Sequence, residues 1–301
     1  MDVREKVRSE GGFGEVWLAR HETLDEIGVF KFCFDPERLR AFKREAAFFK
    51  LLKARLGKRD DIAAVRDLDA SSAPFFLEYD YYSGGNLKRW SENRGGLANI
   101  SLKQRIDIVC KVARATGAAH SAGIVHRDVK PSNILLRESD GAAHPVLADF
   151  GIAAITDEDA LENLDITYSA DDLINIASSR TGTAMYAAPE TLKAKLASEE
   201  AEKRQRDVYS LGVLLYQMVI GDLEEPIGEG WRTEIRRNIK SPDLAEMVEE
   251  DIEKAISKDL SHRISDASGL AVGRGFGWFK MVFLVVAFRE ERIAVGEAVC
   301  D

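Results

Sequence analysis

The stretch that decides the fold is "GIVHRDVKPSNILL", which runs from Gly123 to Leu136. Two short apolar runs flank a polar centre that gathers a base, two cations and an amide within eight residues. The polar side chains of this centre are His126, Arg127, Asp128, Lys130, Ser132 and Asn133. Such a mixture places several chemical functions within reach of one point, which an ordinary surface loop does not need.

Side chains of these kinds could serve the transfer of a phosphoryl group. Asp128 can accept a proton from an attacking hydroxyl, Lys130 can neutralise the group in transfer, and the amide oxygen of Asn133 can bind Mg²⁺. Sixteen residues after Asn133, the triplet "DFG" provides a second hard oxygen ligand at Asp149. Two oxygen ligands with open positions suit Mg²⁺ that carries a nucleotide, because Mg²⁺ prefers phosphates and water to a full protein cage.

A glycine-rich stretch, "SEGGFGEV" from Ser9 to Val16, lies between an expected N-terminal strand and a strand that begins at Glu15. Glycines let the backbone turn tightly and approach phosphate oxygens with its N–H groups. A plain hairpin turn explains the stretch equally well, so it does not identify a nucleotide site by itself.

Lys31 interrupts a β-rich apolar run, and Glu45 lies fourteen residues later, between Phe42 and Phe49 on the apolar face of an expected helix. A carboxylate on a buried face is costly unless a cation pairs with it. Lys31 is therefore a candidate partner for Glu45. Each residue also has an ordinary explanation, as an exposed lysine on a solvated strand face and as a glutamate that reaches water from the helix edge.

The order of the expected elements gives a β-rich first part and a helical second part. Strands are expected over residues 15–20 and 27–34 and twice within 62–82, and helices over 35–57, from 101 onward and over 207–221. Asp35 is a good N-cap and Gly57 ends the first helix, while Ser101 and Gln104 form a capping-box pair. The chain then divides near residue 83, with "YYSGGN" as the connector.

The composition bounds the class of protein. The chain has 301 residues, of which 45% are hydrophobic, enough for one large domain or two lobes. Its formal net charge of -9 argues against a general nucleic-acid binder, which needs clustered cations. Three widely spaced cysteines indicate no disulfide framework, and the charged N-terminus shows no signal peptide, so a cytoplasmic protein is expected.

These features resemble the protein kinase superfamily, and within it the eukaryotic-like serine/threonine protein kinases. Eight of them occur in the family's order: "GGFGEV", Lys31, Glu45, "HRDVKPSN", "DFG", "GTAMYAAPE", "DVYSLG" and Arg263. The resemblance implies an α+β, two-lobed kinase fold over residues 1–271, with a small β-rich N-lobe over about 1–82 that contains one key helix, and a larger, mainly helical C-lobe over about 83–271. It also implies ATP and Mg²⁺ as cofactors, and protein substrates with Ser or Thr.

The resemblance further implies roles for particular residues. Asp128 resembles the catalytic base, Lys31 resembles the lysine that holds the α- and β-phosphates, and Glu45 resembles its helix partner. Lys130, two residues after Asp128, is typical of serine/threonine kinases, and Tyr79 falls at the gatekeeper position behind the adenine. The implied ATP-binding residues are Ser9, Gly11, Gly12, Gly14, Val16, Val29, Lys31, Asp80 and Tyr82, and the implied Mg²⁺ ligands are Asn133 and Asp149.

The acidic segment from Asp149 to Glu190 resembles an activation segment, although a solvated loop explains its charge equally well. A regulatory phosphate paired with Arg127 would sit at Ser178, Ser179 or Thr181, and Thr183 is similar to the threonine that supports the catalytic aspartate and lysine. Glu190 and Arg263 resemble the ion pair that fixes this segment to the helical lobe, and Asp207 resembles the buried acid that orients the catalytic loop.

Three departures from the family pattern are visible, and none removes a catalytic group: Ser9 replaces the first loop glycine, Val29 replaces an alanine of the adenine pocket, and "KDLSHR" lacks a proline that the family often has. Residues 272–301 no longer resemble the family. This tail contains "MVFLVVAF", which is too short to span a membrane. It fits a packed terminal segment, an interfacial membrane anchor or a sequence altered relative to its relatives; otherwise no membrane association is expected.

Three functions follow as hypotheses. The leading one is a serine/threonine protein kinase that transfers the γ-phosphoryl group of ATP and autophosphorylates in its activation segment. The alternative is a pseudokinase, a nucleotide-binding scaffold without useful catalysis, which only Ser9 and Val29 favour. The third is a small-molecule phosphotransferase on a related fold, against which the "APE" segment and the spacing of Lys130 favour a protein substrate.

Overall fold

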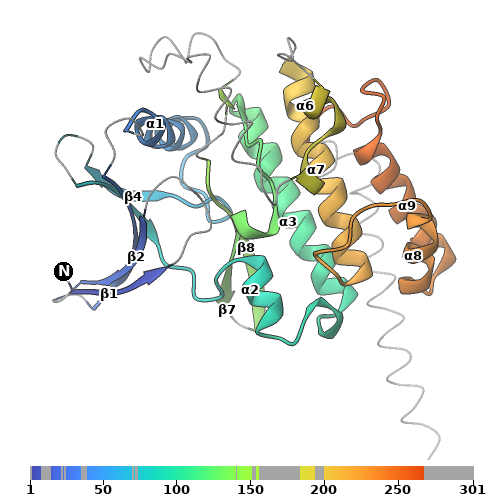
Figure 1. The fold of residues 1–301 in the computed structure, drawn as a ribbon, viewed down its shortest axis with the longest axis horizontal. Coiled ribbons are helices and arrows are strands. Elements are labelled where there is room, and N and C mark those ends of the chain that lie inside the picture. The colour runs from blue at the N-terminus through green and yellow to red at the C-terminus, as the bar shows by residue number, and fades with distance from the viewer. Residues whose placement is uncertain are drawn as a thin grey trace, which may run out of the picture. The chain divides into compact units, whose positions relative to one another are not determined.

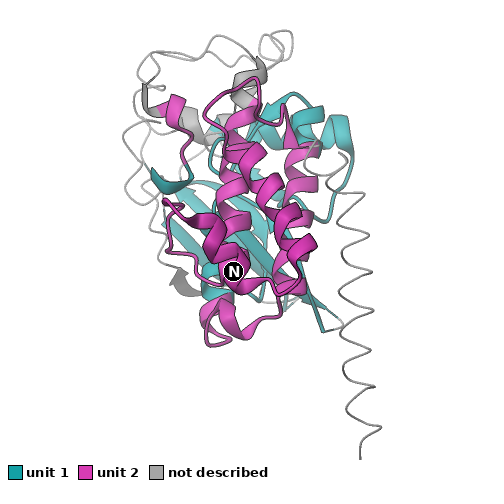
Figure 2. Cartoon of the chain, turned by 90° about the vertical axis from the view of Figure 1, so that its right-hand side faces the viewer, with its two compact units in different colours: residues 1–90, 118–186 teal, residues 91–117, 187–301 magenta. Residues whose placement is uncertain are grey.

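The structure is a computed structural model that describes residues 2–7, 15–21, 23, 25–34, 39–69, 71, 74–139, 141–150, 154–155, 184–193 and 200–267. The chain forms two compact units, which Figure 2 shows in teal and magenta. The first unit contains residues 1–90 and 118–186, and the second contains residues 91–117 and 187–301. The two lobes expected from the sequence divide the chain differently from these two units. The lobe boundary near residue 83 therefore stays a prediction.

The first unit is built on a five-stranded antiparallel sheet with the order β1-β2-β3-β5-β4. Figure 1 labels β1, β2 and β4 of this sheet. Its strands are β1 (Asp2–Val7), β2 (Glu15–Arg20), β3 (Ile27–Cys33), β4 (Val65–Asp69) and β5 (Phe75–Asp80). The register pairs Lys31 with Val16 on β2 and with Leu77 on β5, and it pairs Val29 with Tyr79. Directly paired residues share a face of a sheet, and so do residues two apart on one strand, so these five side chains lie on the same face.

Phenylalanine rings stack on the opposite face of this sheet. The ring centroid of Phe30 lies 6.1 Å from that of Phe32 and 5.8 Å from that of Phe76. Phe32 in turn stacks on Phe34 at 5.9 Å. This stack explains why β3 is apolar on both of its faces and does not alternate between apolar and polar residues.

Helix α1 (Leu39–Leu56) packs on the face of the sheet that carries Lys31, where Ala46 contacts the cluster around Leu77. Its buried side chains recur three or four residues apart, which places them on one side of the helix. They are Glu45, Phe48, Phe49 and Leu52. The helix ends at Gly57, whose φ of +68° is left-handed and favours glycine. The N-cap expected at Asp35 lies outside the described residues.

Two short antiparallel strand pairs in the first unit hold the stretch from Gly123 to Leu136. Strand β6 (Ile124–Val125) pairs with β9 (Ala154–Ile155), and β7 (Ile134–Ser139) pairs with β8 (Ala142–Leu147). A 3-10 turn over Pro131–Asn133 leads into β7, and the N–H of Ala148 donates to the carbonyl of Asn133 at 2.9 Å. Paired strands therefore fix both ends of the loop over residues 126–133.

Helices make up most of the described part of the second unit. It contains α6 (Pro189–Lys193), α7 (Glu200–Ile220), α8 (Trp231–Asn238), α9 (Pro242–Ile256) and most of α3 (Leu102–Ser121), while α2 (Leu87–Glu92) lies at the junction of the units in sequence. Helix α7, which is buried nearly all round from residue 207 to 219 as expected, contacts both α8 and α9 (Figure 1). Gly212 allows the close approach, because a Cβ at this position would lie 2.7 Å from the Cβ of Ala255.

The Ser101 half of the capping box predicted for α3 is confirmed, since the N–H of Gln104 donates to the Ser101 Oγ at 3.2 Å. Within the described parts of the chain, no helix has both the length and the apolar character needed to cross a membrane. The tail over residues 272–301 lies outside those parts.

Candidate active site

The loop over residues 126–133 is held from beneath by a histidine. The ring of His126 is fully buried, its Nε2 lies 3.0 Å from the carbonyl oxygen of Ala148, and its Nδ1 accepts a 3.3 Å hydrogen bond from the N–H of Asp128. These contacts join the start of the loop to the residue before Asp149. His126 therefore has a structural role beneath this loop.

Two residues near this histidine have left-handed backbone conformations that non-glycine residues rarely adopt. Arg127 has a φ of 68°, and Asp149 has a φ of 63°. Such conformations cost energy and persist where the surrounding contacts fix them, often at functional sites. Of the two aspartates at or beside these positions, Asp149 has 53% of its side chain exposed, whereas Asp128 has only 12% exposed.

Asp128 is held by two neighbours from its own loop. The amide Nδ2 of Asn133 donates to the Asp128 Oδ2 at 2.9 Å and to the Asp128 carbonyl at 2.8 Å. The Lys130 Nζ lies 2.7 Å from the same Oδ2. Because both side-chain contacts go to one carboxylate oxygen, Oδ1 keeps its capacity to accept a proton, as far as the described residues show.

Lys31 and Glu45 form the ion pair that the sequence predicts. The Lys31 Nζ lies 2.6 Å from the Glu45 Oε2 and 3.8 Å from the Asp149 Oδ1. Burial lowers the pKa of Lys31, but the carboxylates of Glu45 and Asp149 outweigh it and leave the pKa above its ordinary value. The ammonium group is therefore charged at all physiological pH values, and the cost of burying Glu45 is offset as expected.

A contact that the sequence did not reveal completes the surroundings of Glu45. The hydroxyl of Tyr79 on β5 donates to the Glu45 Oε1 at 2.5 Å. Burial and the neighbouring carboxylate raise the pKa of Tyr79 well above its ordinary value, so the hydroxyl keeps its proton. The position of Tyr79 on the Lys31 face of the sheet follows from strand alternation, but its distance from an α1 side chain does not.

A series of aromatic contacts connects Tyr79 to His126, which supports the loop that contains Asp128. The ring of Phe49, one turn after Glu45 on α1, lies edge-on to Tyr79 at 5.9 Å and to Phe150 at 5.7 Å. Phe150 in turn lies 4.6 Å from the ring of His126. These contacts pack α1, Phe150 and His126 together within the first unit.

The residues expected around the adenine lie on the same sheet and just beyond it. Val16 and Val29 share the face of Lys31 and are half-buried, and the chain leaves β5 at Asp80. The hydroxyl of Tyr82 is partly buried, and this burial raises its pKa to about 12. The glycine-rich positions Ser9, Gly11, Gly12 and Gly14 lie outside the described residues.

The oxygen atoms near Asp128 suit a divalent cation that arrives with a nucleotide. Asn133 uses its Nδ2 to hold Asp128, its Oδ1 accepts a long 3.4 Å hydrogen bond from the Ser132 hydroxyl, and the Asp149 carboxylate is half-exposed. Among the described residues, no group of three or more His, Cys, Asp or Glu side chains could hold a metal by itself. Two protein oxygens match Mg²⁺, which takes its remaining ligands from phosphates and water.

The structural residues expected in the helical part are placed as follows. Arg263 forms a bidentate ion pair with Glu190, so the predicted pair is confirmed. Asp207 on α7 is fully buried. The expected activation-segment residues Ser178, Ser179, Thr181 and Thr183 lie outside the described residues.

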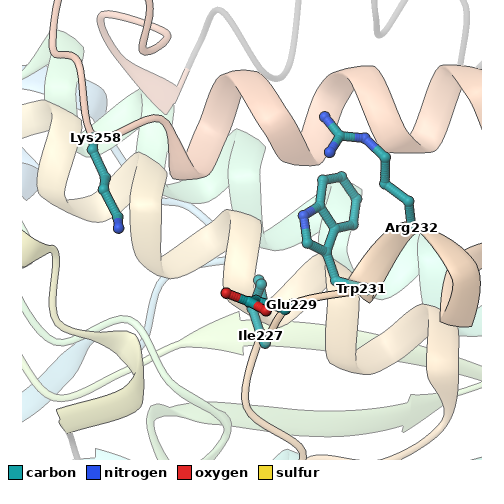
Figure 3. Close-up of a pocket in the computed structure, with 7 residues that line it drawn as sticks. Ile227, Glu229, Trp231, Arg232 and Lys258 are labelled. Carbon is teal, nitrogen blue, oxygen red and sulfur yellow. The ribbon is translucent and has the colours of Figure 1, made fainter.

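A hollow in the second unit lies apart in sequence from all these residues. It has a volume of about 620 Å³ and is lined by residues 227–232 and Lys258 (Figure 3). The guanidinium of Arg232 lies 4.6 Å from the centre of the Trp231 ring and pairs with Glu253. No residue to which the sequence assigns a role lines this hollow.

Comparison with known proteins agrees with this geometry. The family described as "Protein kinase domain" matches residues 4–267. The chain is 32% identical over 295 residues to the serine/threonine-protein kinase PkaA of Streptomyces coelicolor, covering 89% of this chain and 48% of the relative. It is 27% identical over 314 residues to PrkC of Bacillus subtilis, covering 97% and 42%, and 31% identical over 276 residues to PknA of Mycobacterium tuberculosis, covering 86% and 57%. The chain thus spans about half the length of these relatives.

Proposed function

Because the chain belongs to the protein kinase family, we propose that it transfers the γ-phosphoryl group of ATP to serine and threonine hydroxyls of protein substrates. The α+β kinase fold expected from the sequence, with its β-rich and helical parts, agrees with this membership. The observation that carries the proposal is that one compact unit contains the whole reacting set, with Lys31 paired to Glu45 and Asp128 held by Lys130 and Asn133. The relatives named serine/threonine kinases, and Lys130 two residues after Asp128, support the choice of Ser and Thr.

The side chains divide the reaction between them. Asp128 orients the attacking hydroxyl and accepts its proton at Oδ1, while Asn133 and Lys130 fix the carboxylate through Oδ2. Lys130 also places a positive charge beside the transferring group, and Lys31, aligned by Glu45, binds the α- and β-phosphates. Mg²⁺ bound through Asn133 and Asp149 would supply charge neutralisation at the phosphates.

The pseudokinase alternative lacks support in the site. Its two sequence arguments are Ser9, which lies outside the described residues, and Val29, which is half-buried and keeps the expected strand position. The positions that catalysis requires are all occupied by competent residues. We therefore expect turnover and not nucleotide binding alone.

We also propose that the enzyme phosphorylates its own activation segment at Ser178, Ser179 or Thr181. Arg127 precedes Asp128, and a phosphate on the segment can form one to three charge-assisted hydrogen bonds with such an arginine. Seven acidic residues upstream oppose docking of the unphosphorylated segment by like-charge repulsion: Asp157, Glu158, Asp159, Glu162, Asp165, Asp171 and Asp172. Mass spectrometry of active protein should find phosphate between Ser178 and Thr183, and fully active protein without phosphate there would contradict this proposal.

The direct test of the function uses γ-labelled ATP, Mg²⁺ and a generic basic protein, followed by phosphoamino-acid analysis. We expect label on phosphoserine and phosphothreonine, and none on phosphotyrosine. The Lys31→Met variant, prepared identically, excludes a contaminating kinase. Binding of ATP without any transfer would overturn the kinase proposal in favour of the scaffold.

A further inference from the structure

The proposed reaction does not explain why the hydroxyl of Tyr79 lies beside Glu45. This hydroxyl donates to Glu45, a residue that contacts Lys31. Glu45 is only 3% exposed, so its carboxylate can obtain little hydrogen bonding from water. Tyr79 is thus a third partner of the Lys31–Glu45 ion pair, and its contribution to that pair needs an explanation.

The two oxygens of Glu45 are divided between two partners. Oε2 accepts from the Lys31 Nζ at 2.6 Å, and Oε1 accepts from the Tyr79 hydroxyl at 2.5 Å. A carboxylate held at one oxygen can rotate about its terminal bond, whereas one held at both oxygens has a single orientation. Tyr79 therefore determines which way Glu45 presents its charge to Lys31.

Tyr79 is itself anchored in a rigid element. On β5 it is paired with Val29 of β3 on one side and with Val65 of β4 on the other, so its backbone belongs to the interior of the sheet. Lys31 also lies on β3, two residues from Val29. One sheet thus holds both partners of Glu45 at fixed positions, and the carboxylate of α1 fits between them.

The side chain contacts α1 at two points one turn apart. The hydroxyl contacts Glu45, and the ring lies edge-on to Phe49 at 5.9 Å. The ring contact is apolar packing that a phenylalanine would preserve, and the hydroxyl contact is a charge-assisted hydrogen bond that it would not. The two contributions can therefore be separated by removing one oxygen atom.

The hydroxyl of Tyr79 stays protonated. Burial and the adjacent Glu45 raise the pKa of Tyr79 well above its ordinary value. The group is thus a donor throughout the pH range in which an enzyme is assayed.

We propose that Tyr79 is a positioning residue, which holds Glu45 in the one orientation that aligns Lys31 and keeps α1 docked on the sheet. This inference rests on the proposed function, because the alignment of Lys31 matters through its contact with ATP phosphates. Tyr79 itself touches no reacting atom. It acts through Glu45, and its contribution should disappear when Glu45 can no longer bind Lys31 as a carboxylate.

The test compares four proteins: the wild-type chain, Tyr79→Phe, Glu45→Gln and the double variant. Amide hydrogen exchange is measured on the peptide over residues 39–56, and kcat/KM for ATP is measured in parallel. The Tyr79→Phe variant should exchange about 10-fold faster in this helix and lose about 10-fold in kcat/KM, because a buried charged acceptor loses its donor. In the Glu45→Gln background, the same substitution should add little to either effect.

A matched control removes a hydroxyl from another buried tyrosine. Tyr216 lies on α7 in the second unit and is 1% exposed, and Tyr216→Phe should leave exchange over residues 39–56 unchanged. If Tyr79→Phe leaves the exchange unchanged, or if its effect is equally large in the Glu45→Gln background, the positioning role is wrong. If exchange responds as expected but the wild-type chain transfers no phosphate, the coupling of Tyr79 to Glu45 stands and the proposed function fails.

Discussion

The guanidinium of Arg263 donates to both carboxylate oxygens of Glu190, at 2.6 Å to Oε1 and 3.0 Å to Oε2. The arginine side chain is fully buried, and its Nε donates to the carbonyl of Ser257 at 2.8 Å. The ring of Tyr209 on α7 lies 5.3 Å from the guanidinium carbon. This pair joins α6 to a segment beyond α9 that is 73 residues away in sequence, all within the second unit.

Removal of Glu190 should therefore destabilise the protein strongly. In Glu190→Ala the buried guanidinium of Arg263 loses its counter-charge, which typically costs about 3–5 kcal/mol. The matched control is Glu234→Ala, which breaks an exposed pair with Arg237 and should cost about 0–1 kcal/mol. Urea denaturation followed by circular dichroism measures both. Equal losses in the two variants would mean that burial does not set the strength of the pair.

A second buried arginine stabilises the end of α7. The Arg105 Nη1 donates to the carbonyls of Met218 at 2.6 Å and Val219 at 3.0 Å, and its Nε donates to the carbonyl of Ile100 at 2.9 Å. Burial lowers the pKa of Arg105, and the negative end of the helix dipole compensates the charge that has no carboxylate partner among these contacts.

Arg105→Lys should lose about 2 kcal/mol of stability, because a lysine cannot reach three carbonyls in the fixed geometry of a guanidinium. Arg114→Lys, the same change at an exposed position of the same helix, should be close to neutral. Thermal unfolding of both variants provides the comparison. A neutral Arg105→Lys would show that the charge alone, and not the fork of donors, stabilises the helix end.

Asp251 on α9 should make the protein less stable as the pH rises. Burial raises its pKa from 3.8 to about 6, although Lys254 opposes the shift. Below about pH 4 the carboxyl is protonated in both the folded and unfolded states. Between about pH 4 and 6 the unfolded state loses its proton first, so the free energy of unfolding falls, by about 3 kcal/mol at most.

Asp251→Asn should abolish this part of the pH dependence and raise the stability at pH 7. Asp243 is an exposed residue in the first turn of the same helix, where a carboxylate interacts favourably with the helix dipole. Asp243→Asn should therefore neither abolish this pH dependence nor raise the stability at pH 7. Denaturation at pH 4 and pH 7 separates the two. If the Asp251→Asn variant kept the full pH dependence of stability, that dependence would come from other titratable groups.

Much of the fold could be predicted from the sequence, because local rules determine it. The strands that contain Lys31 and Tyr79 follow from β-rich runs, and the end of α1 at Gly57 follows from the conformational freedom of glycine. The pair between Lys31 and Glu45 was also predicted, since a carboxylate on a buried helix face needs a cation. Resemblance to a family supplied the order of the other site residues.

Other contacts between segments that are distant in sequence could not be predicted. The bond from Tyr79 to Glu45 depends on the separation of α1 from the sheet, which no local pattern encodes. The burial of Arg105 is similar, because an arginine on an amphipathic helix normally reaches water. The faces of β3 could not be told apart from the sequence, because the phenylalanines that begin at Phe30 make both faces of the strand apolar.

Lys31→Met should abolish phosphoryl transfer while leaving the protein folded. The variant loses the charge that binds the phosphates, and we expect activity to fall by at least about 100-fold. Glu45 keeps the hydroxyl of Tyr79 as a donor, which limits the structural damage. Glu45→Gln should lose less activity, because an amide oxygen still accepts from Lys31. Far-ultraviolet circular dichroism checks the fold, and retained activity in Lys31→Met would remove this residue from the mechanism.

The account depends most directly on Asp128, whose carboxylate is held at Oδ2 by Lys130 and Asn133. The decisive measurement is the single-turnover rate of transfer from ATP to a serine-containing substrate, for the wild-type chain and for Asp128→Asn. A general base contributes about 10²–10⁴-fold, so the variant should be slower by that factor with an unchanged KM for ATP. Asp107→Asn, the same chemical change in a surface pair with Lys111, should transfer at the wild-type rate. An Asp128→Asn variant as fast as the wild-type chain would contradict the account.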